Sequence, residues 1–248
     1  MGRGEGGLPM KYIASCSFGK DSLATIILAY LHNEPLDEIV YARVMFDENT
    51  SAEIPEHEEF IHKTAIPLLR YLGYKVTIVQ SDYTFLDCFF RVRCKGANVG
   101  KYVGFPIPGR CDVQRDCKLK AIRKYKEEHA GEEVTQYLGI ALDEPERLAR
   151  LGKDQISLLA KYGVTEAGAE FICKMFGLYS PIYKFTRRGG CFFCPNQSLK
   201  ELRHLKINHP DLWSRLLELS KVPNKASIKY DRDYTFEEID QLLTTKEA

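Results

Sequence analysis

The chain has 248 residues, of which 44% are hydrophobic and 28% are charged, and its formal net charge at pH 7 is +1. This is the composition of an ordinary globular protein, and the near-neutral charge neither indicates nor excludes a nucleic-acid partner. No apolar run reaches the roughly 20 residues that a membrane span requires. The chain also lacks a basic-then-apolar leader, so we expect a cytoplasmic protein with no membrane partner.

The stretch Tyr12–Leu28 has the pattern of a strand, a turn and a helix. The apolar run Tyr12–Ala14 predicts a buried strand, and the apolar residues from Leu23 onward recur at helical spacing. The turn between them, Ser15–Ser22, is rich in serine and glycine. Such a turn presents the N–H groups of the first helical turn, and the positive end of the helix dipole, to an anion. The stretch therefore predicts a phosphate-binding site.

The residue types in this turn suit phosphate binding. Gly19 lets the backbone approach an anion closely, and Ser17 and Ser22 supply hydroxyl donors. Lys20 supplies a full positive charge. Asp21 would be repelled by phosphates unless a cation lay between them, which favours Mg²⁺. The residues expected to line the site are Ser15, Ser17, Phe18, Gly19, Lys20, Asp21 and Ser22.

After the turn, strands and helices alternate along the chain. Glu38–Phe46 and Lys75–Gln80 read as strands, and Ser51–Gly73 reads as an amphipathic helix with a break at Pro67. Another strand is expected at Val134–Ile140. This alternation predicts an α/β fold with a mainly parallel, Rossmann-like doubly wound sheet.

The remaining pattern divides the chain into parts. Residues 81–108 are rich in glycine and proline and predict a long loop, which in compact domains is usually functional or disordered. We expect a disordered extension or expression remnant at 1–9, a nucleotide-binding domain at 10–180 and a helical C-terminal module at 181–248. Further helices are expected at Ala121–His129, Thr165–Phe176, Leu199–Ile207 and Pro210–Leu219, and after a capping box at Thr235.

The eight cysteines indicate metal or sulfur chemistry, because a cytosolic α/β chain seldom carries a disulfide framework. Cys191 and Cys194 form a CxxC motif on a Gly-Gly turn. Two thiolates at this spacing can reach one metal, and soft thiolate ligands select zinc or an iron–sulfur cluster. By contrast, we expect Cys16, Cys88 and Cys173 to be small core residues.

The turn Ser17–Ser22 resembles the SxGxDS pyrophosphate loop of the adenine nucleotide alpha hydrolases, also called the PP-loop ATP pyrophosphatase superfamily. Within it, the chain is most similar to the phosphoadenosine phosphosulfate (PAPS) reductase-like family. Further segments resemble this family's elements in the same order along the chain. These are Cys117–Lys120, Gly139-Ile140 with Asp143, Glu144 and Arg147, Ser180–Tyr183, and Gly190–Pro195.

The chain also departs from the family's reductases. No cysteine follows Cys194, whereas thioredoxin-dependent PAPS reductases end in a tail whose cysteine attacks the sulfonucleotide. Ala141 stands where the family usually has arginine, and Pro145 where it has serine. Because the loop retains Lys20 and the full SxGxDS pattern, the resemblance favours the members that cleave ATP.

The resemblance implies an ATP-dependent adenylating enzyme that acts in sulfur transfer or thiolation. A substrate oxygen attacks the α-phosphate of ATP, pyrophosphate leaves, and sulfur from a donor protein displaces the adenylated oxygen. The catalytic residues would be Lys20, Asp21, Ser17 and Ser22, with Gly139 and Phe46 as further neighbours of the nucleotide. Two alternatives remain open, namely a thioredoxin-dependent sulfonucleotide reductase and a non-catalytic nucleotide-binding subunit of a DNA-modification or defence complex.

The resemblance also bears on the metal and on the partners. It makes Cys117 the third metal ligand beside Cys191 and Cys194, and it favours a 4Fe–4S cluster over zinc. Cys111, which precedes Cys117 on the same loop, is the best fourth ligand and Cys94 the next candidate, although both could be ordinary loop thiols. A basic neighbourhood follows the CxxC motif. It fits either a polyanionic substrate, such as tRNA, DNA or a nucleotide, or a solvated helix face. Its members are Arg187, Arg188, Lys200, Arg203, His204 and Lys206.

Overall fold

A computed structural model describes residues 10–109, 111–187 and 189–245. The expected extension 1–9 and Arg188 lie outside these residues. By contacts the chain forms two compact units. The first comprises the described residues up to Ala42, Pro55–Val79 and Ala121–Pro181, and the second comprises Arg43–Ile54, Gln80–Lys120 and the residues from Ile182 onward. The boundary expected after residue 180 stays a prediction, and the second unit also contains two earlier stretches of chain.

The first unit is built on a five-stranded sheet in the order β3-β2-β1-β5-β6. The ladders of β1 with β2, β1 with β5, and β5 with β6 are parallel. The strands are β1 (Met10–Ser15), β2 (Glu38–Arg43), β3 (Lys75–Gln80), β5 (Glu133–Leu138) and β6 (Gln155–Ile156). The expected mainly parallel α/β fold is therefore confirmed.

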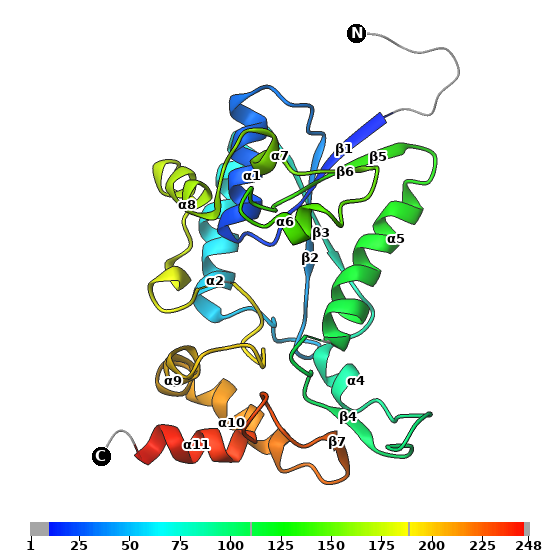
Figure 1. The fold of residues 1–248 in the computed structure, drawn as a ribbon, viewed down its shortest axis with the longest axis vertical. Helices are drawn as coiled ribbons and strands as arrows, with labels where there is room; N and C mark the ends of the chain where they lie inside the picture. Colours follow the sequence, from blue (N-terminus) through cyan, green and yellow to red (C-terminus); the bar gives the residue numbers. More distant parts are fainter. Residues whose placement is uncertain (1–9, 110, 188, 246–248) are drawn as a thin grey trace. The chain divides into compact units, whose positions relative to one another are not determined.

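Helices cover both faces of this sheet, as the positions of α1 and α5 show (Figure 1). The core between α1 and the sheet is made of buried aliphatic side chains such as Leu23, Ile26 and Ile39. The helices of this unit are α1 (Lys20–Leu31), α2 (Pro55–Phe60), α3 (Ile66–Tyr71), α5 (Lys120–Glu128), α6 (Pro145–Leu148), α7 (Leu158–Lys161) and α8 (Glu166–Met175).

The break expected at Pro67 takes the form of a π-helical turn, Ile61–Ala65, between α2 and α3. The N–H of Ile66 donates to the carbonyl of Ile61, five residues earlier. Pro67 has no N–H to donate to the helical hydrogen bonds. It lies in the first turn of α3, where the backbone N–H groups need no partner within the helix. A second π-helical turn, Gln114–Leu119, leads into α5.

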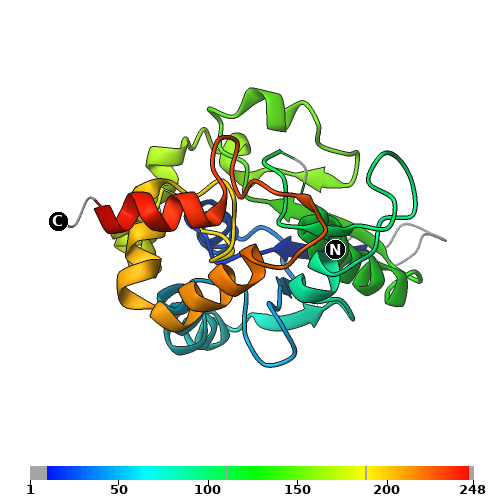
Figure 2. The same cartoon turned by 90° about the horizontal axis from the view of Figure 1, so that it is seen from below.

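The second unit has an aromatic core, in which Phe46, Phe85, Phe192 and Phe193 are buried together. Its helices α9, α10 and α11 lie side by side (Figure 2). The stretch 81–108, expected as a long loop, contains α4 and β4, and β4 pairs in parallel with β7. The elements of this unit are α4 (Phe85–Phe89), β4 (Tyr102–Gly104), α9 (Leu199–Asn208), α10 (Pro210–Ser220), β7 (Lys225–Ser227) and α11 (Phe236–Thr245), with a 3₁₀ turn at Pro181–Lys184. Across the described ranges, no helix combines the length and apolarity needed to cross a membrane.

Candidate functional site

The turn between β1 and α1 is fixed by buried side chains. Phe18 has a positive φ of 57°, which is uncommon for a residue other than glycine. Its ring is fully buried and lies edge-on to Tyr41, with the ring centroids 5.0 Å apart. Its N–H donates to the sulfur of Cys16 at 3.2 Å. Packing therefore holds the backbone in a conformation that the isolated sequence would rarely adopt.

The hydroxyl of Ser22 connects the two ends of this turn. It donates to the carbonyl of Gly19 at 2.9 Å and accepts the N–H of Ser17 at 3.3 Å. Ser15 lies at the end of β1, and its hydroxyl accepts from Gln136 on β5. The three serines expected at the phosphate site thus also fix its shape.

The start of α1 has no side-chain cap. Gly19 is the N-cap residue, and its backbone is extended. Because glycine has no side chain, it cannot supply the usual side-chain acceptor for the first N–H groups of the helix. Within the described chain, the N–H groups of Gly19, Asp21 and Ser22 have no hydrogen-bond acceptor. N–H groups left unpaired at a helix start, together with the helix dipole, favour an anion at this point.

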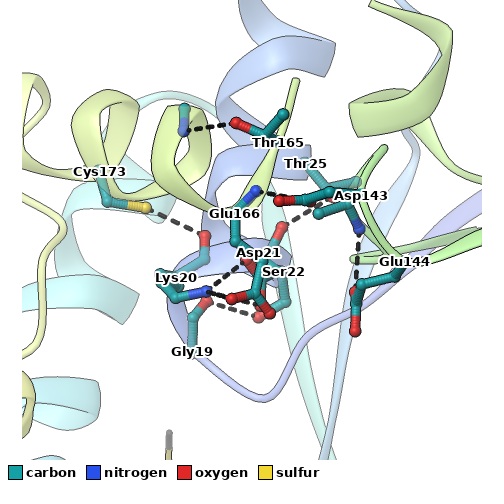
Figure 3. Close-up of polar contacts among 12 residues, drawn as sticks. Gly19, Lys20, Asp21, Ser22, Thr25, Asp143, Glu144, Thr165, Glu166 and Cys173 are labelled. Atoms are coloured by element: carbon teal, nitrogen blue, oxygen red, sulfur yellow. Dashed lines mark hydrogen bonds and ion pairs between the residues drawn. The ribbon is translucent and has the colours of Figure 1, made fainter. Parts of the chain in front are cut away.

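Lys20 and Asp21 form an ion pair at the helix start, with Lys20 Nζ 3.0 Å from Asp21 Oδ1 and 3.5 Å from Glu166 Oε2 (Figure 3). Burial acts to lower the pKa of Lys20, but the hydrogen bond and charge of Asp21, with those of Glu166, raise it above its ordinary value. The pKa of Asp21 is also raised, mainly by burial, against the opposing effect of Lys20. Lys20 therefore carries its positive charge at neutral pH.

Two further acidic residues lie around this pair. The carboxylate of Asp143 accepts the N–H of Glu166 at 3.0 Å, at the start of α8. Glu144 accepts the N–H of Ala141 at 3.1 Å, and its charge contributes to the raised pKa of Asp21. Sequence analysis singled out Asp143 and Glu144 from the family resemblance but took Glu166 only as part of a helix start. The structure brings all three together around the loop (Figure 3).

Gly139 contacts the loop itself. A Cβ atom at this position would lie 2.6 Å from the backbone nitrogen of Ser22 and 2.7 Å from the carbonyl carbon of Asp21. A side chain there would push the start of α1 away from the end of β5. Gly139 was expected to lie next to the nucleotide, and in the structure it permits the close approach of β5 to the loop.

His57 on α2 is a contact of the loop that sequence analysis missed. The imidazole is 1% exposed, its Nδ1 lies 2.9 Å from Ser180 Oγ, and its Nε2 lies 3.3 Å from the carbonyl oxygen of Ser17. It thereby joins the loop to Ser180, the first residue of the segment Ser180–Tyr183. A lone histidine that forms no metal-ligand spacing gives no signal in the sequence for such a contact.

Phe46 belongs to the second unit and is 1% exposed there. Its N–H donates to Thr50, its carbonyl accepts the N–H of Leu86, and its ring packs against Phe85 and Phe192. Both backbone groups and the ring are thus engaged inside this unit. A nucleotide contact at Phe46 stays a prediction.

The four cysteines expected to bind metal, Cys111, Cys117, Cys191 and Cys194, all lie in the second unit. Burial raises the pKa of the Cys191 thiol, and the nearby charges of Glu53, Cys194 and Cys111 raise it further. Cys191 also raises the pKa of Cys117, so the four thiols form one electrostatic neighbourhood. A cavity of about 20 Å³ is lined by both cysteines of the CxxC motif and by Gly189 and Gly190.

Cys88 is a fifth thiol in this neighbourhood. It is buried, as expected, but its sulfur lies 3.8 Å from the sulfur of Cys117 and 3.6 Å from a guanidinium nitrogen of Arg91. Its hydrogen bond with Cys117, and then the charge of Arg91, lower the pKa of Cys88, while the same bond raises the pKa of Cys117. Sequence analysis missed this contact because Cys88 lies in an aromatic run with no cysteine motif around it.

The basic neighbourhood after the CxxC motif is partly engaged within the second unit. Lys206 Nζ lies 3.0 Å from Asp240 Oδ1 and also donates to Thr244. The ring of His204 is stacked on Phe185, with the centroids 3.5 Å apart. These contacts favour the reading of a structured helix face for part of the cluster.

No protein-family model matches the sequence, and no curated protein matches it. Among solved structures, the chain is similar to the U34-tRNA thiolase NcsA from Methanococcus maripaludis, which was solved with its 4Fe–4S cluster. The sequences are 18% identical, and the TM-score is 0.44. The alignment covers 95% of this chain and 72% of the thiolase chain.

Proposed function

We propose that this chain is an ATP-dependent adenylating enzyme of the ATP pyrophosphatase type that acts in sulfur transfer or thiolation. The observation that carries the proposal is the uncapped start of α1, where the N–H groups of Gly19, Asp21 and Ser22 are unpaired within the described chain beside the charged Lys20. The order of the PAPS reductase-like motifs along the sequence supports the same reading.

In the proposed reaction, a substrate oxygen attacks the α-phosphorus of ATP. The bond to the β-phosphate oxygen breaks, and pyrophosphate leaves with the electron pair. A sulfur nucleophile then attacks the activated carbon, and AMP leaves with the substrate oxygen. Negative charge builds up on the phosphoryl oxygens in the first step, where the fixed N–H dipoles and Lys20 stabilise it. Ser17 and Ser22 keep the loop in the shape that this requires.

A divalent cation is part of the proposal because carboxylates crowd the start of α1. The charges of Glu166 and Glu144 both act on Asp21 there, and the triphosphate of ATP would add more negative charge. Oxygen ligands from carboxylates and phosphates are those that Mg²⁺ prefers. Asp21 is the residue we propose to hold the cation, which would neutralise charge on the departing pyrophosphate.

The cysteine neighbourhood of the second unit fits a soft metal centre by its chemistry. Thiolates at four or five nearby positions suit an iron–sulfur cluster or zinc. The resemblance to the PAPS reductase-like family favours a 4Fe–4S cluster over zinc. We propose Cys111, Cys117, Cys191 and Cys194 as ligands, with Cys88 as an additional candidate.

The acceptor that we propose is a nucleic acid, tRNA or DNA, or a free nucleotide, with a separate protein as sulfur donor. Among the described residues of the basic neighbourhood, the exposed side chains of Arg187 and Lys200 have no acidic partner, which supports this class of acceptor. A sulfonucleotide reductase is disfavoured because the loop retains Lys20 and the full SxGxDS pattern, which resembles the members of the superfamily that cleave ATP.

The test is pyrophosphate release from ATP by the purified chain, with candidate tRNA, DNA and nucleotide acceptors supplied in turn. Lys20→Ala and Asp21→Ala should each lower the rate by about 10²-fold or more, because each removes a preorganised charge from the transition state. Lys124→Ala, on the exposed surface of α5, is the matched control and should leave the rate unchanged.

Circular dichroism should confirm that the variants remain folded. Release that persists unchanged in Lys20→Ala and Asp21→Ala would contradict the proposal. ATP binding without pyrophosphate release, with any acceptor, would instead identify a non-catalytic nucleotide-binding subunit.

A further inference from the structure

The second unit contains a cavity of about 560 Å³, which falls within the usual size range of small-molecule sites. It is lined by the segment 91–95, by β4 and the segment that follows it, and by two residues near the start of the second π-helical turn. Neither the loop before α1 nor the CxxC motif contributes to it. The lining residues are Arg91, Val92, Arg93, Cys94, Lys95, Val103, Phe105, Pro106, Ile107, Asp112 and Arg115.

The charge of this cavity is strongly positive. Its lining has four cationic side chains and one carboxylate, Asp112, which is paired with Arg115 at 2.7 Å. The side chains of Arg93 and Lys95 have neither an acidic nor a hydrogen-bonding partner in the described chain. Two cations without counter-charges, which face the same hollow, favour an anionic ligand.

The other two cations are held in place from behind by a buried carboxylate. Asp116 has a side chain that is only 3% exposed, and its Oδ2 lies 2.7 Å from Arg91 and 2.6 Å from Arg115. Arg115 also donates from Nε to Oδ1 at 3.0 Å, which makes this pair bidentate. Guanidinium groups fixed in this way lose little entropy when they bind a ligand. Arg91 and Arg115 therefore form a fixed part of the lining, and the phosphate contact falls to Arg93 and Lys95.

Apolar side chains also line the cavity. Phe105 is 2% exposed, while Val92 and Ile107 are about half exposed. Inorganic phosphate alone would leave these side chains uncovered. A ligand with both a phosphate and an apolar or planar group would contact both the cationic and the apolar part of the lining.

We propose that this cavity binds an organic phosphate, such as a nucleoside monophosphate or one nucleotide of a nucleic acid, with its phosphate on Arg93 and Lys95 and its organic part against Phe105 and Ile107. The site lies in a different unit from the loop before α1. It would therefore operate whether or not that loop cleaves ATP.

Cys94 provides a local reporter for this site. Its thiol is exposed, and it lines the cavity between Arg93 and Lys95. The experiment measures the rate at which iodoacetamide alkylates Cys94, by mass spectrometry of the full-length chain, with inorganic phosphate, AMP or a short oligonucleotide as probe. AMP should slow the alkylation in a saturable way, and inorganic phosphate should do so only at much higher concentration.

The double variant Arg93→Ala/Lys95→Ala should weaken the protection by AMP at least about tenfold, because each change removes a charged contact to the phosphate. The control Lys221→Ala removes an exposed lysine outside the cavity and should keep full protection. Lys20→Ala should also keep it, which separates this site from ATP binding at the loop.

Protection by AMP that exceeds that of the oligonucleotide would support a free nucleotide as the ligand, and the reverse order would support a nucleic acid. Equal protection by AMP and inorganic phosphate would overturn the proposal for an organic phosphate. Absence of protection by all three probes, or full protection in Arg93→Ala/Lys95→Ala, would overturn it as well.

Discussion

At the scale of single residues, the loop before α1 depends on a histidine that carries no motif. His57 contacts the carbonyl of Ser17 and the hydroxyl of Ser180, and its side chain is buried. Because both of its nitrogens lie within hydrogen-bonding distance of a partner, its loss leaves polar groups of the loop without that partner. His57 would affect the site only through its contact with Ser17, so we regard His57 as a residue that positions the loop.

We expect His57→Ala to lower the free energy of unfolding by about 1–3 kcal/mol, as measured by urea denaturation. Ser180→Ala removes only one of the two contacts and should cost less. His57→Ala should also raise the ATP concentration needed for half-maximal pyrophosphate release, because the loop loses a support. An unchanged half-maximal concentration, in a variant that is destabilised as expected, would assign His57 a purely structural role.

Some contacts of the loop were predictable from the sequence, and others were not. The spacing of Ser17, Gly19, Lys20 and Asp21 is local, so a pattern of six residues was enough to predict the phosphate loop. The contacts of His57 and Glu166 join positions far apart in the chain, and each residue alone has an ordinary alternative role on the surface or at a helix start. Gly139 gave a signal only through the family resemblance, although its closeness to Ser22 is a matter of packing.

At the scale of elements, Glu38 ties three strands and a helix together. It is 2% exposed and lies on β2, with Lys11 of β1 at 3.1 Å and Lys75 of β3 at 3.0 Å. Tyr125 of α5 donates to it at 2.7 Å, and Thr77 donates as well. Burial acts to raise the pKa of Glu38, but these hydrogen bonds and charges outweigh it and lower the pKa to about 2.

A carboxylate with a lowered pKa stabilises the fold at pH values above its ordinary pKa, and this contribution is lost as the pH falls towards its folded-state pKa. We therefore expect Glu38→Gln to lower the free energy of unfolding by about 3 kcal/mol at pH 7, because it leaves Lys11 with no buried partner on β2. The difference from the unaltered chain should shrink between pH 4.5 and pH 2. Urea denaturation across this range measures it, and a difference that stays constant with pH would contradict the assignment.

Many elements of both units were predictable because their signals are local. The strand at Lys75–Gln80 was predicted at its observed bounds, and α8, α9 and α10 agree to within a residue at each end. The capping box at Thr235 is present, with Thr235 and Glu238 bonded reciprocally. The β4–β7 pair was missed because two strands of three residues each, distant in sequence, have no periodicity to detect.

At the scale of the whole molecule, the metal centre is the feature that composition predicts most directly. We expect anaerobic purification to yield a brown protein that contains iron and sulfide and absorbs near 400 nm, the region typical of iron–sulfur clusters. A protein that contains zinc instead of iron and sulfide would support a zinc site on these cysteines.

Cys191→Ser should lose most of the bound metal, because it removes a ligand of the CxxC motif. Cys173→Ser is the matched control, since Cys173 is buried in the first unit and its sulfur donates to the carbonyl of Lys20 at 3.1 Å. It should retain the metal. Cys88→Ser tests the additional candidate, and full metal content there would exclude Cys88 as a ligand. Metal content that is unaffected by Cys191→Ser would contradict the proposed centre.

The pairing of Tyr102 with Lys225 has a consequence for how the protein is made. As the polypeptide emerges from the ribosome, β4 is available long before its partner strand has been translated. Its backbone edge must wait for β7, during which time it is open to chaperones or to neighbouring nascent chains. The second unit can therefore complete this strand pair only after β7 has been synthesised.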